Sequence, residues 1–180
     1  MDQTTRPDTG FIIRAVEPAE YAVLGEITAR AYLDDGLLDF GADDPYLARL
    51  RDVAGRAAGA EVLVAVDAGE RAGGGGGVLG GVAYVVAGSA WAEVAGDGEA
   101  EFRMLAVASA ARGRGVGDAL VRECVARARA TEGCVRVRLS TQKAMLGAHR
   151  IYERLGFVRT PERDWSPVPG LSLLTYSLEI

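Results

Sequence analysis

The residues best suited to chemistry form a short glycine-rich run, Arg112-Gly113-Arg114-Gly115-Val116-Gly117. The run lies between a segment typical of a strand and a segment typical of a helix. Glycines let the chain turn tightly and approach a ligand closely, and the first N–H groups of a helix have no partner within it and can bind phosphate. Two arginines add positive charge. The run therefore indicates a phosphate site, although alone it also fits a glycine-rich helix entry with solvated arginines.

A second glycine-rich stretch, residues 75–80, matches the GxGxxG spacing of dinucleotide-binding loops. That fingerprint requires a strand before the glycines and a helix after them. Here the glycines at 73–77 predict a flexible turn, and the apolar residues 78–86 that follow predict a strand. The match is therefore interpreted as a coincidence of composition. The sequence contains no GxxxxGK[ST] loop.

Cysteine and histidine are scarce in the chain. Cys124 and Cys134 are the two cysteines, and they form no CxxC pair. We interpret both as small apolar side chains in a reducing compartment rather than as a disulfide or a catalytic thiol. His149 is the single histidine, which excludes a multi-histidine zinc centre. We expect no metal.

The elements that must position the glycine-rich run alternate between strands and helices. Apolar and alternating segments predict strands at residues 11–14, 61–66, 78–86, 101–107, 135–139 and 173–180. Apolar residues at helical spacing predict helices after Pro18, after Pro45, over 115–130 and over 144–155. Residues 34–44 and 88–98 are predicted loops, and the proline-containing segment 159–169 is predicted to be an ordered, extended loop. This interleaving predicts a mixed α and β fold.

Length and composition predict one domain. The chain has 180 residues, of which 49% are hydrophobic and 25% charged, as in ordinary soluble proteins. We predict a flexible tail over residues 1–10 and a single domain over 11–180. No apolar run reaches the roughly 18 residues of a membrane helix, and the polar start lacks a signal-peptide core, so we expect a cytoplasmic protein without a membrane partner. The abundance of Ala, Gly and Arg suggests GC-rich coding and hence a bacterium.

Charge is distributed unevenly along the chain. The formal net charge of −5 divides into −10 over residues 1–100 and +5 over residues 101–180. A net acidic chain argues against a nucleic-acid partner, and the asymmetry suggests that the two halves contact different molecules.

Two motifs are more informative together than either is alone. Arg112, Gly115 and Gly117 fill the pattern [QR]-x-x-G-x-[GA], and Ala148, Tyr152, Gly156 and Phe157 fill A-x-x-x-Y-x-x-x-G-F one helix and one strand later. Over residues 101–157 the set resembles the GNAT superfamily of acyl-CoA-dependent N-acetyltransferases. The resemblance implies the GNAT fold, a mostly antiparallel, twisted sheet of about six to seven strands, splayed at the acetyl-CoA site and flanked by about four helices.

The resemblance also implies how the chain would bind acetyl-CoA or another short acyl-CoA. Main-chain groups near Leu105 and Val107 would pair with the pantetheine arm, and an N–H at a strand bulge near Leu105 would polarise the thioester carbonyl. The glycine-rich run would surround the pyrophosphate. The residues implied to bind the cofactor are Leu105, Ala106, Val107, Arg112, Gly113, Arg114, Gly115, Val116, Gly117 and Asp118.

The implied reaction is direct attack of a primary amine on the acetyl thioester. Tyr152 corresponds to the family's usual proton donor to the departing thiolate, although an isolated tyrosine more often only packs. Glu101 lies where many relatives carry a carboxylate and is the candidate base. Glu99 shares its face of the strand. Either carboxylate could instead be a solvated residue of the strand, and a chain of water molecules could serve as the base.

One position departs from the family pattern. Met145 stands where many relatives carry an asparagine whose amide contacts the cofactor, and Thr141 and Gln142 are the candidates to replace that contact. His149 precedes Tyr152 by three residues and is interpreted as a packing or surface residue.

The acceptor is less well defined by the sequence. The predicted loop at residues 34–44, here named the acidic loop, contains Asp34, Asp35, Asp39, Asp43 and Asp44. This loop is either solvated or attracts a cationic amine. Trp165 either walls the acceptor pocket or packs. A small-molecule amine is favoured, and a protein N-terminus or lysine is the alternative. A non-catalytic acyl-CoA-binding sensor is a second possible function, and a homodimer is compatible with the family.

Overall fold

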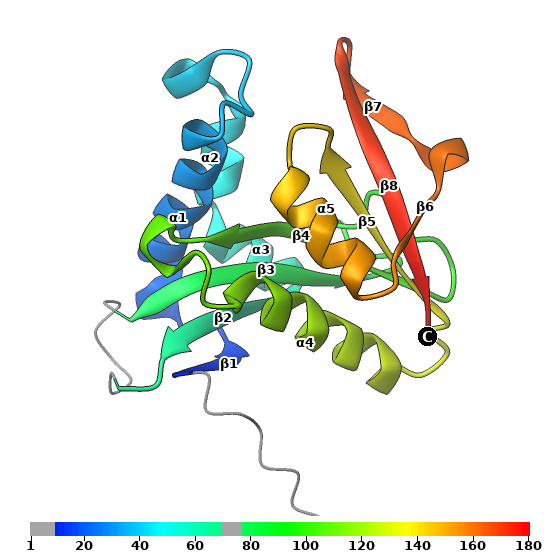
Figure 1. Cartoon of the computed structure of the whole chain (residues 1–180), viewed down its shortest axis with the longest axis horizontal. Coiled ribbons are helices and arrows are strands. Elements are labelled where there is room, and N and C mark those ends of the chain that lie inside the picture. Colours follow the sequence, from blue (N-terminus) through cyan, green and yellow to red (C-terminus); the bar gives the residue numbers. More distant parts are fainter. Residues whose placement is uncertain (1–9, 70–76) are drawn as a thin grey trace, which may run out of the picture.

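The structure, a computed structural model, describes residues 10–69 and 77–180. The predicted tail at 1–10 and turn at 73–77 therefore lie largely outside the described residues. The described strands form one sheet in the order β1-β2-β3-β4-β5-β8-β6, with β7 paired to β8 (Figure 1). All pairs are antiparallel except β4 with β5. The strands are β1 Phe11–Ala15, β2 Glu61–Asp67, β3 Val78–Val86, β4 Glu99–Val107, β5 Arg136–Gln142, β6 Val158–Arg159, β7 Trp165–Val168 and β8 Leu171–Glu179.

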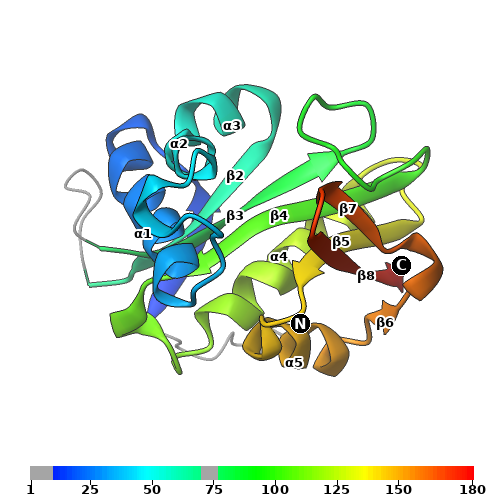
Figure 2. The same cartoon turned by 90° about the horizontal axis from the view of Figure 1, so that it is seen from above.

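Helices cover both faces of this sheet (Figure 2). One face carries α1 Tyr21–Asp34, α2 Tyr46–Arg51 and α3 Val53–Gly59, and the other carries α4 Val116–Ala130 and α5 Leu146–Arg154. The larger core lies between the sheet and α4, where Leu120, Val121 and Cys124 are fully buried. Short 3-10 helices occur at Pro18–Glu20, Gly41–Asp43, Ser109–Ala111 and Pro161–Arg163.

The predicted helix after Pro45 is in fact two helices, because Asp52 interrupts it. Asp52 adopts φ −78° and ψ 69°, and its side chain accepts a hydrogen bond of 2.8 Å from the N–H of Gly55 at the start of α3. The buried guanidinium of Arg56 donates to the carbonyls of Arg49 and Leu50 in the last turn of α2. These bonds satisfy backbone groups that would otherwise be unpaired where the two helices meet.

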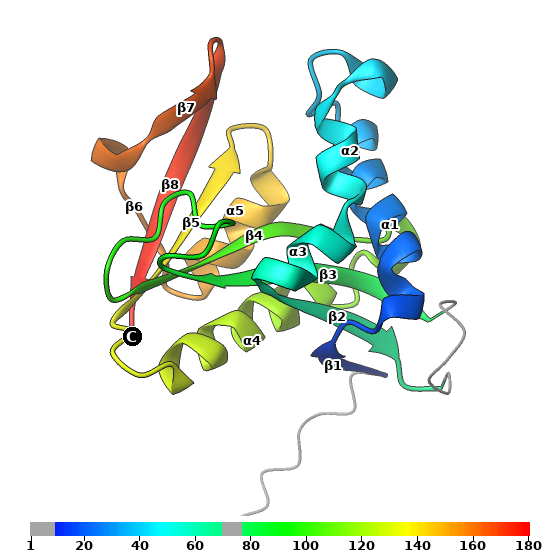
Figure 3. The ribbon, with the colours of Figure 1, turned by 180° about the vertical axis from the view of Figure 1, so that it is seen from behind.

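All six predicted strands are present, and the structure differs from the prediction at two places. β4 begins at Glu99, two residues earlier than predicted. The segment 159–169, predicted to be an extended loop, instead contributes the end of β6, a 3-10 helix and β7. β7 and β8 form a hairpin because Gly170 adopts φ +85° between them. This hairpin and the α1–α2 segment project in the same direction, one on each side of the sheet's open end (Figure 3).

A bulge and a divergence open the middle of the sheet. Between Arg103 and Ala106, β4 has one residue more than β3 opposite it, and Met104 has φ +54°. Glycines on β3 make room for this bulge, since a Cβ on Gly80 would lie 2.5 Å from the carbonyl oxygen of Ala106. β4 and β5 pair only from Glu99 to Glu101 and then separate. The predicted splay and bulge are therefore present at Leu105.

Candidate active site

Two cavities flank β4 where it separates from β5. The first, here named the glycine-turn cavity, has a volume of about 740 Å³ and is lined by the end of β4, the start of α4 and the start of α5. The second, named the tyrosine cavity, has a volume of about 720 Å³ and is lined by the α1–α2 segment, β4, β5 and the β7–β8 hairpin. Both volumes are typical of small-molecule sites. Four residues line both cavities, namely Tyr32, Leu37, Leu105 and Met145.

The glycine-turn cavity presents main-chain donors. Gly113 and Gly115 both adopt φ +81°, which side chains rarely tolerate, and Gly115 directly precedes α4 without a side-chain cap. The first N–H groups of α4 therefore face a place where an anion can accept their hydrogen bonds. Gly117 allows α5 to approach, because a Cβ there would lie 3.1 Å from Cδ1 of Ile151.

Nine of the ten predicted cofactor residues line the glycine-turn cavity, and Arg114 does not. The Arg114 guanidinium instead lies 3.4 Å from Oδ2 of Asp67, at the end of β2. The residues that do line it are Leu105, Ala106, Val107, Arg112, Gly113, Gly115, Val116, Gly117 and Asp118.

Charged pairs border the same cavity. Arg112 lies 3.3 Å from Asp35, which follows α1, so this pair joins the two sides of the cavity. Arg154 of α5 donates to Asp118 at 2.9 Å. Both arginines line the cavity, where they could meet the negative charge of a phosphate ligand.

The tyrosine cavity contains phenols that the sequence analysis did not single out. Tyr32 and Tyr46 line it with ring centroids 6.2 Å apart. Burial raises the pKa of both phenols above the ordinary value. The two tyrosines belong to no recognised motif, so no signal in the sequence pointed to them. They reach the cavity because α1 packs beside α2.

Tyr152 lines the tyrosine cavity from α5. Its ring is buried among Phe102, Phe157 and Tyr176, at centroid distances of 5.7, 6.1 and 5.8 Å. Burial raises the pKa of Tyr152, so the phenol stays protonated at neutral pH. A protonated phenol at a cavity wall can donate a proton to a ligand.

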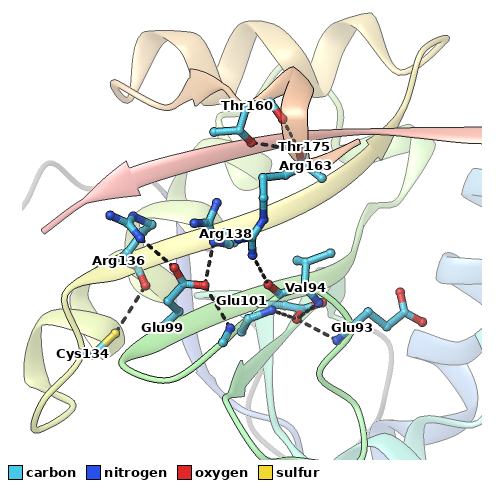
Figure 4. Close-up of polar contacts among 12 residues, drawn as sticks. Glu93, Val94, Glu99, Glu101, Cys134, Arg136, Arg138, Thr160, Arg163 and Thr175 are labelled. Carbon is cyan, nitrogen blue, oxygen red and sulfur yellow. Dashed lines mark hydrogen bonds and ion pairs between the residues drawn. The ribbon is translucent and has the colours of Figure 1, made fainter. Parts of the chain in front are cut away.

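Glu101 also lines the tyrosine cavity, and the loop before β4 surrounds its carboxylate (Figure 4). Its Oε2 accepts hydrogen bonds from the N–H groups of Glu93, Val94 and Ala95 at 2.9, 2.9 and 3.0 Å. Its Oε1 lies 3.8 Å from Nε of Arg103. Only Oε1 is therefore placed to contact a ligand.

Glu99 lies at the closed end of the splay, where β4 and β5 are still paired (Figure 4). It pairs with Arg138 at 2.6 Å and with Arg136 at 2.8 Å, both on β5. Burial alone would raise the pKa of Glu99, but hydrogen bonds from Arg138, the N–H of Gly96 and Arg136 outweigh it and lower the pKa to about 2. Glu99 does not line either cavity.

The polar residues beside Tyr152 have structural partners. Gln142 donates its amide to the carbonyl of Leu37 at 3.2 Å, and Thr141 contacts Sδ of Met145 at 3.6 Å. His149 is buried against Tyr176, as expected of a packing residue, and its Nε2 lies 3.0 Å from the carbonyl of Gln142. Trp165 packs rather than lining the tyrosine cavity, and it donates to Oγ of Ser140 at 2.9 Å.

The acidic loop divides between the two cavities. Asp39 and Asp44 line the tyrosine cavity, and Asp35 lines the glycine-turn cavity. Asp34 and Asp43 line neither. The five carboxylates are therefore not gathered at one cavity.

The described residues offer neither a site for a metal ion nor a helix that could span a membrane. Within 10–69 and 77–180, no cluster of three or more His, Cys, Asp or Glu residues could hold a metal ion. No helix in that part of the chain is long and apolar enough to cross a membrane.

Comparisons with known proteins place this geometry in context. The model of the acetyltransferase (GNAT) family matches residues 26–157. No curated protein matches the chain. The fold is similar to that of yncA from Salmonella typhimurium with its cofactor acetyl-CoA, at a TM-score of 0.65 and 22% identity over 94% of both chains.

Two further solved structures have a similar fold. A ribosomal-protein-alanine N-acetyltransferase from Brucella melitensis matches at a TM-score of 0.64 and 22% identity, over 94% of this chain and 99% of that chain. A spermidine N-acetyltransferase from Vibrio cholerae, in complex with CoA and spermine, matches at 0.65 and 14% identity, over 96% of both chains. The names of these two proteins differ in the acceptor, so the fold does not specify it.

Proposed function

We propose that this chain, which belongs to the acetyltransferase (GNAT) family, transfers the acetyl group of acetyl-CoA to a primary amine of a small molecule. The observation that carries the proposal is the meeting of two cavities at Tyr32, Leu37, Leu105 and Met145, with Tyr152 on the wall of one of them. A bisubstrate reaction needs this arrangement, because each reactant must reach the same point from a different side.

The glycine-turn cavity is the proposed acetyl-CoA site. The N–H groups at the start of α4, with Gly113 and Gly115 in the turn before it, would hold the pyrophosphate. Arg112 would add charge once it left Asp35. The bulged main chain at Leu105 would polarise the thioester carbonyl. Arg114 would contribute only its main chain.

Tyr152 is the proposed proton donor in the transfer. The amine nitrogen forms a bond to the carbonyl carbon, the carbon–sulfur bond breaks, and Tyr152 gives its proton to the departing sulfur. The proton released by the amine restores the phenol through the base or solvent, so the step is balanced. Burial raises the pKa of Tyr152, which keeps this proton in place before the reaction.

Glu101 is the proposed base, acting through Oε1 or through a water molecule beside it. This role is compatible with the position of Glu101 on the cavity wall and with the occupation of Oε2 by three N–H groups. A homodimer, a cytoplasmic location and a bacterial source remain predictions.

The proposal is tested by binding and then by turnover. Acetyl-CoA at 100 times its Kd should raise the free energy of unfolding by about 2.7 kcal/mol, measured as a thermal shift. Release of free thiol over a panel of amines should then identify an acceptor. Binding without thiol release for any amine would indicate the alternative function, an acyl-CoA-binding sensor.

A further inference from the structure

The walls of the tyrosine cavity are mostly apolar, and much of the apolar lining comes from two projecting segments. Leu37, Leu38 and Phe40 face it from the α1–α2 segment, and Val168 and Leu171 face it from the β7–β8 hairpin. Phe40 is 70% exposed and Val168 is 51% exposed, so large apolar side chains lie on both sides of the cavity with solvent access. Exposed apolar surface beside a cavity is characteristic of a site that binds an apolar group.

Several polar side chains of the cavity are already engaged within the protein. Ser140 accepts from Trp165, and Gln142 donates to the carbonyl of Leu37. Both carboxylate oxygens of Asp44 accept main-chain N–H groups, from Tyr46 at 2.9 Å and from Phe40 at 3.3 Å. A ligand with many polar groups would therefore lose hydrogen bonds to water, and it could regain them mainly from the phenols of Tyr32, Tyr46 and Tyr152.

The charges of the cavity favour a cation and disfavour an anion. Four carboxylates line it against two guanidinium groups. Arg103 already contacts Glu93 at 2.6 Å, and Arg49 stacks on the Trp91 ring at 4.4 Å. A substrate carboxylate would therefore meet net negative charge and occupied arginines. The remaining carboxylates are Asp39, Asp44 and Glu101.

We propose that the acceptor is a primary amine attached to an unsubstituted alkyl or aryl body, with no carboxylate and no second cationic group. This inference rests on the proposed function. The amine lies at the junction of the two cavities, near Tyr32 and Tyr152, and the apolar body lies between the α1–α2 segment and the β7–β8 hairpin. The net negative charge of the cavity attracts the ammonium group, while the apolar body gains free energy by leaving water.

The test compares amines of equal length at saturating acetyl-CoA. Hexylamine, 1,6-diaminohexane and 6-aminohexanoate share a six-carbon chain and differ in the group at its far end. We expect kcat/KM for hexylamine to exceed that of the other two by about tenfold or more, since one misplaced polar group or methylene changes specificity by about that factor. From butylamine to hexylamine, kcat/KM should rise by up to about fourfold per methylene.

A matched pair of variants locates the apolar body. Val168→Lys places a charge on the hairpin wall, and Val135→Lys makes the same change at a residue that is 54% exposed and lines neither cavity. Val168→Lys should lower kcat/KM for hexylamine by about tenfold without changing the Kd of acetyl-CoA. Val135→Lys should change neither quantity.

The outcomes separate the inference from the proposed function. Preference for spermidine, for 6-aminohexanoate or for a peptide N-terminus over hexylamine would overturn the inference and leave the acetyltransferase intact. Equal effects of the two lysine variants would also overturn it. Acetyl-CoA binding without acetylation of any amine would overturn the proposed function and this inference together.

Discussion

The glycine-turn cavity and the tyrosine cavity differ in the origin of their walls. The first is centred on one short stretch that turns through Gly113 and Gly115 into α4, and its remaining walls come from the ends of α1 and β4 and from α5. The second is built from side chains of four segments that are far apart in the sequence. A main-chain site tolerates most side chains but requires particular backbone angles, whereas a side-chain site changes its ligand with each substitution. One fold can therefore keep a common cofactor while acceptors vary.

The largest expected effect is at Tyr152, on the wall of the tyrosine cavity. Tyr152→Phe removes the proposed proton donor, so kcat should fall by about 10² to 10⁴-fold, while the Kd of acetyl-CoA stays unchanged. Because burial raises the pKa of Tyr152 above 10.0, ionisation of this phenol should not reduce the wild-type rate below pH 10. Tyr176→Phe is the control, since Tyr176 packs on the same ring but lines neither cavity. Equal turnover by both variants would remove Tyr152 from the mechanism.

Glu101→Gln tests the acceptor side in the same assay. If Oε1 is the base, kcat/KM should fall by about 10²-fold at neutral pH, with little change in acetyl-CoA binding. Glutamine keeps an oxygen for the three N–H groups of the 93–95 loop. A loss of folding stability with kcat/KM preserved in the folded fraction would instead show that Glu101 only anchors this loop.

Glu99→Gln tests the closed end of the splay, on which both cavities depend. The pKa of Glu99 is lowered from 4.5 to about 2, which corresponds to about 3 kcal/mol of stability at neutral pH. That contribution is complete above about pH 4.5 and is lost as the pH falls toward 2. The variant should lose this pH dependence, measured by urea unfolding between pH 7 and pH 2. An unchanged stability profile would contradict the assignment.

Gly115→Ala tests the main-chain cavity. A side chain at φ +81° costs about 1 to 2 kcal/mol, so the Kd of acetyl-CoA should rise by about 5 to 30-fold if the turn relaxes to avoid this strain. Gly88→Ala is the control, because Gly88 has φ +86° and does not line either cavity. Both variants should lose similar stability, and only Gly115→Ala should weaken binding, as measured by calorimetry.

The smallest expected effect concerns the pair that joins the two sides of the glycine-turn cavity. Asp35 competes with an anionic ligand for Arg112, and exposed ion pairs contribute less than about 1 kcal/mol. Asp35→Asn should therefore tighten acetyl-CoA binding by about two- to fivefold at low salt. The neighbouring Asp34→Asn should have no effect. Weaker binding in Asp35→Asn would mean that Asp35 supports the cofactor site rather than opposing it.

The same difference between the cavities explains what the sequence could predict. Backbone angles depend on local residues, so two motifs and the family resemblance that they carry predicted the glycine turn before α4, the bulge at Leu105 and nine residues that line the glycine-turn cavity. The fold class and the six main strands followed from apolar patterns. The motif also predicted that Arg114 binds the cofactor, but a tertiary ion pair with Asp67 directs its side chain away from the glycine-turn cavity.

The tyrosine cavity could not be predicted in this way. Tyr32, Tyr46 and Val168 reach it only because α1, α2 and the β7–β8 hairpin fold toward the same end of the sheet. The hairpin itself was missed because prolines in 159–169 favour an extended loop, while the pairing of β7 with β8 is decided by the turn at Gly170.

The most direct test of the two-cavity account is amide hydrogen exchange measured by mass spectrometry, with and without acetyl-CoA. Acetyl-CoA alone should slow exchange over residues 113–119, at the start of α4, and over residues 105–107, which line the glycine-turn cavity. Exchange over residues 165–171 should change only when an acceptor amine is added. Slowed exchange over 165–171 with acetyl-CoA alone, together with unchanged exchange over 113–119, would contradict the assignment of the two cavities.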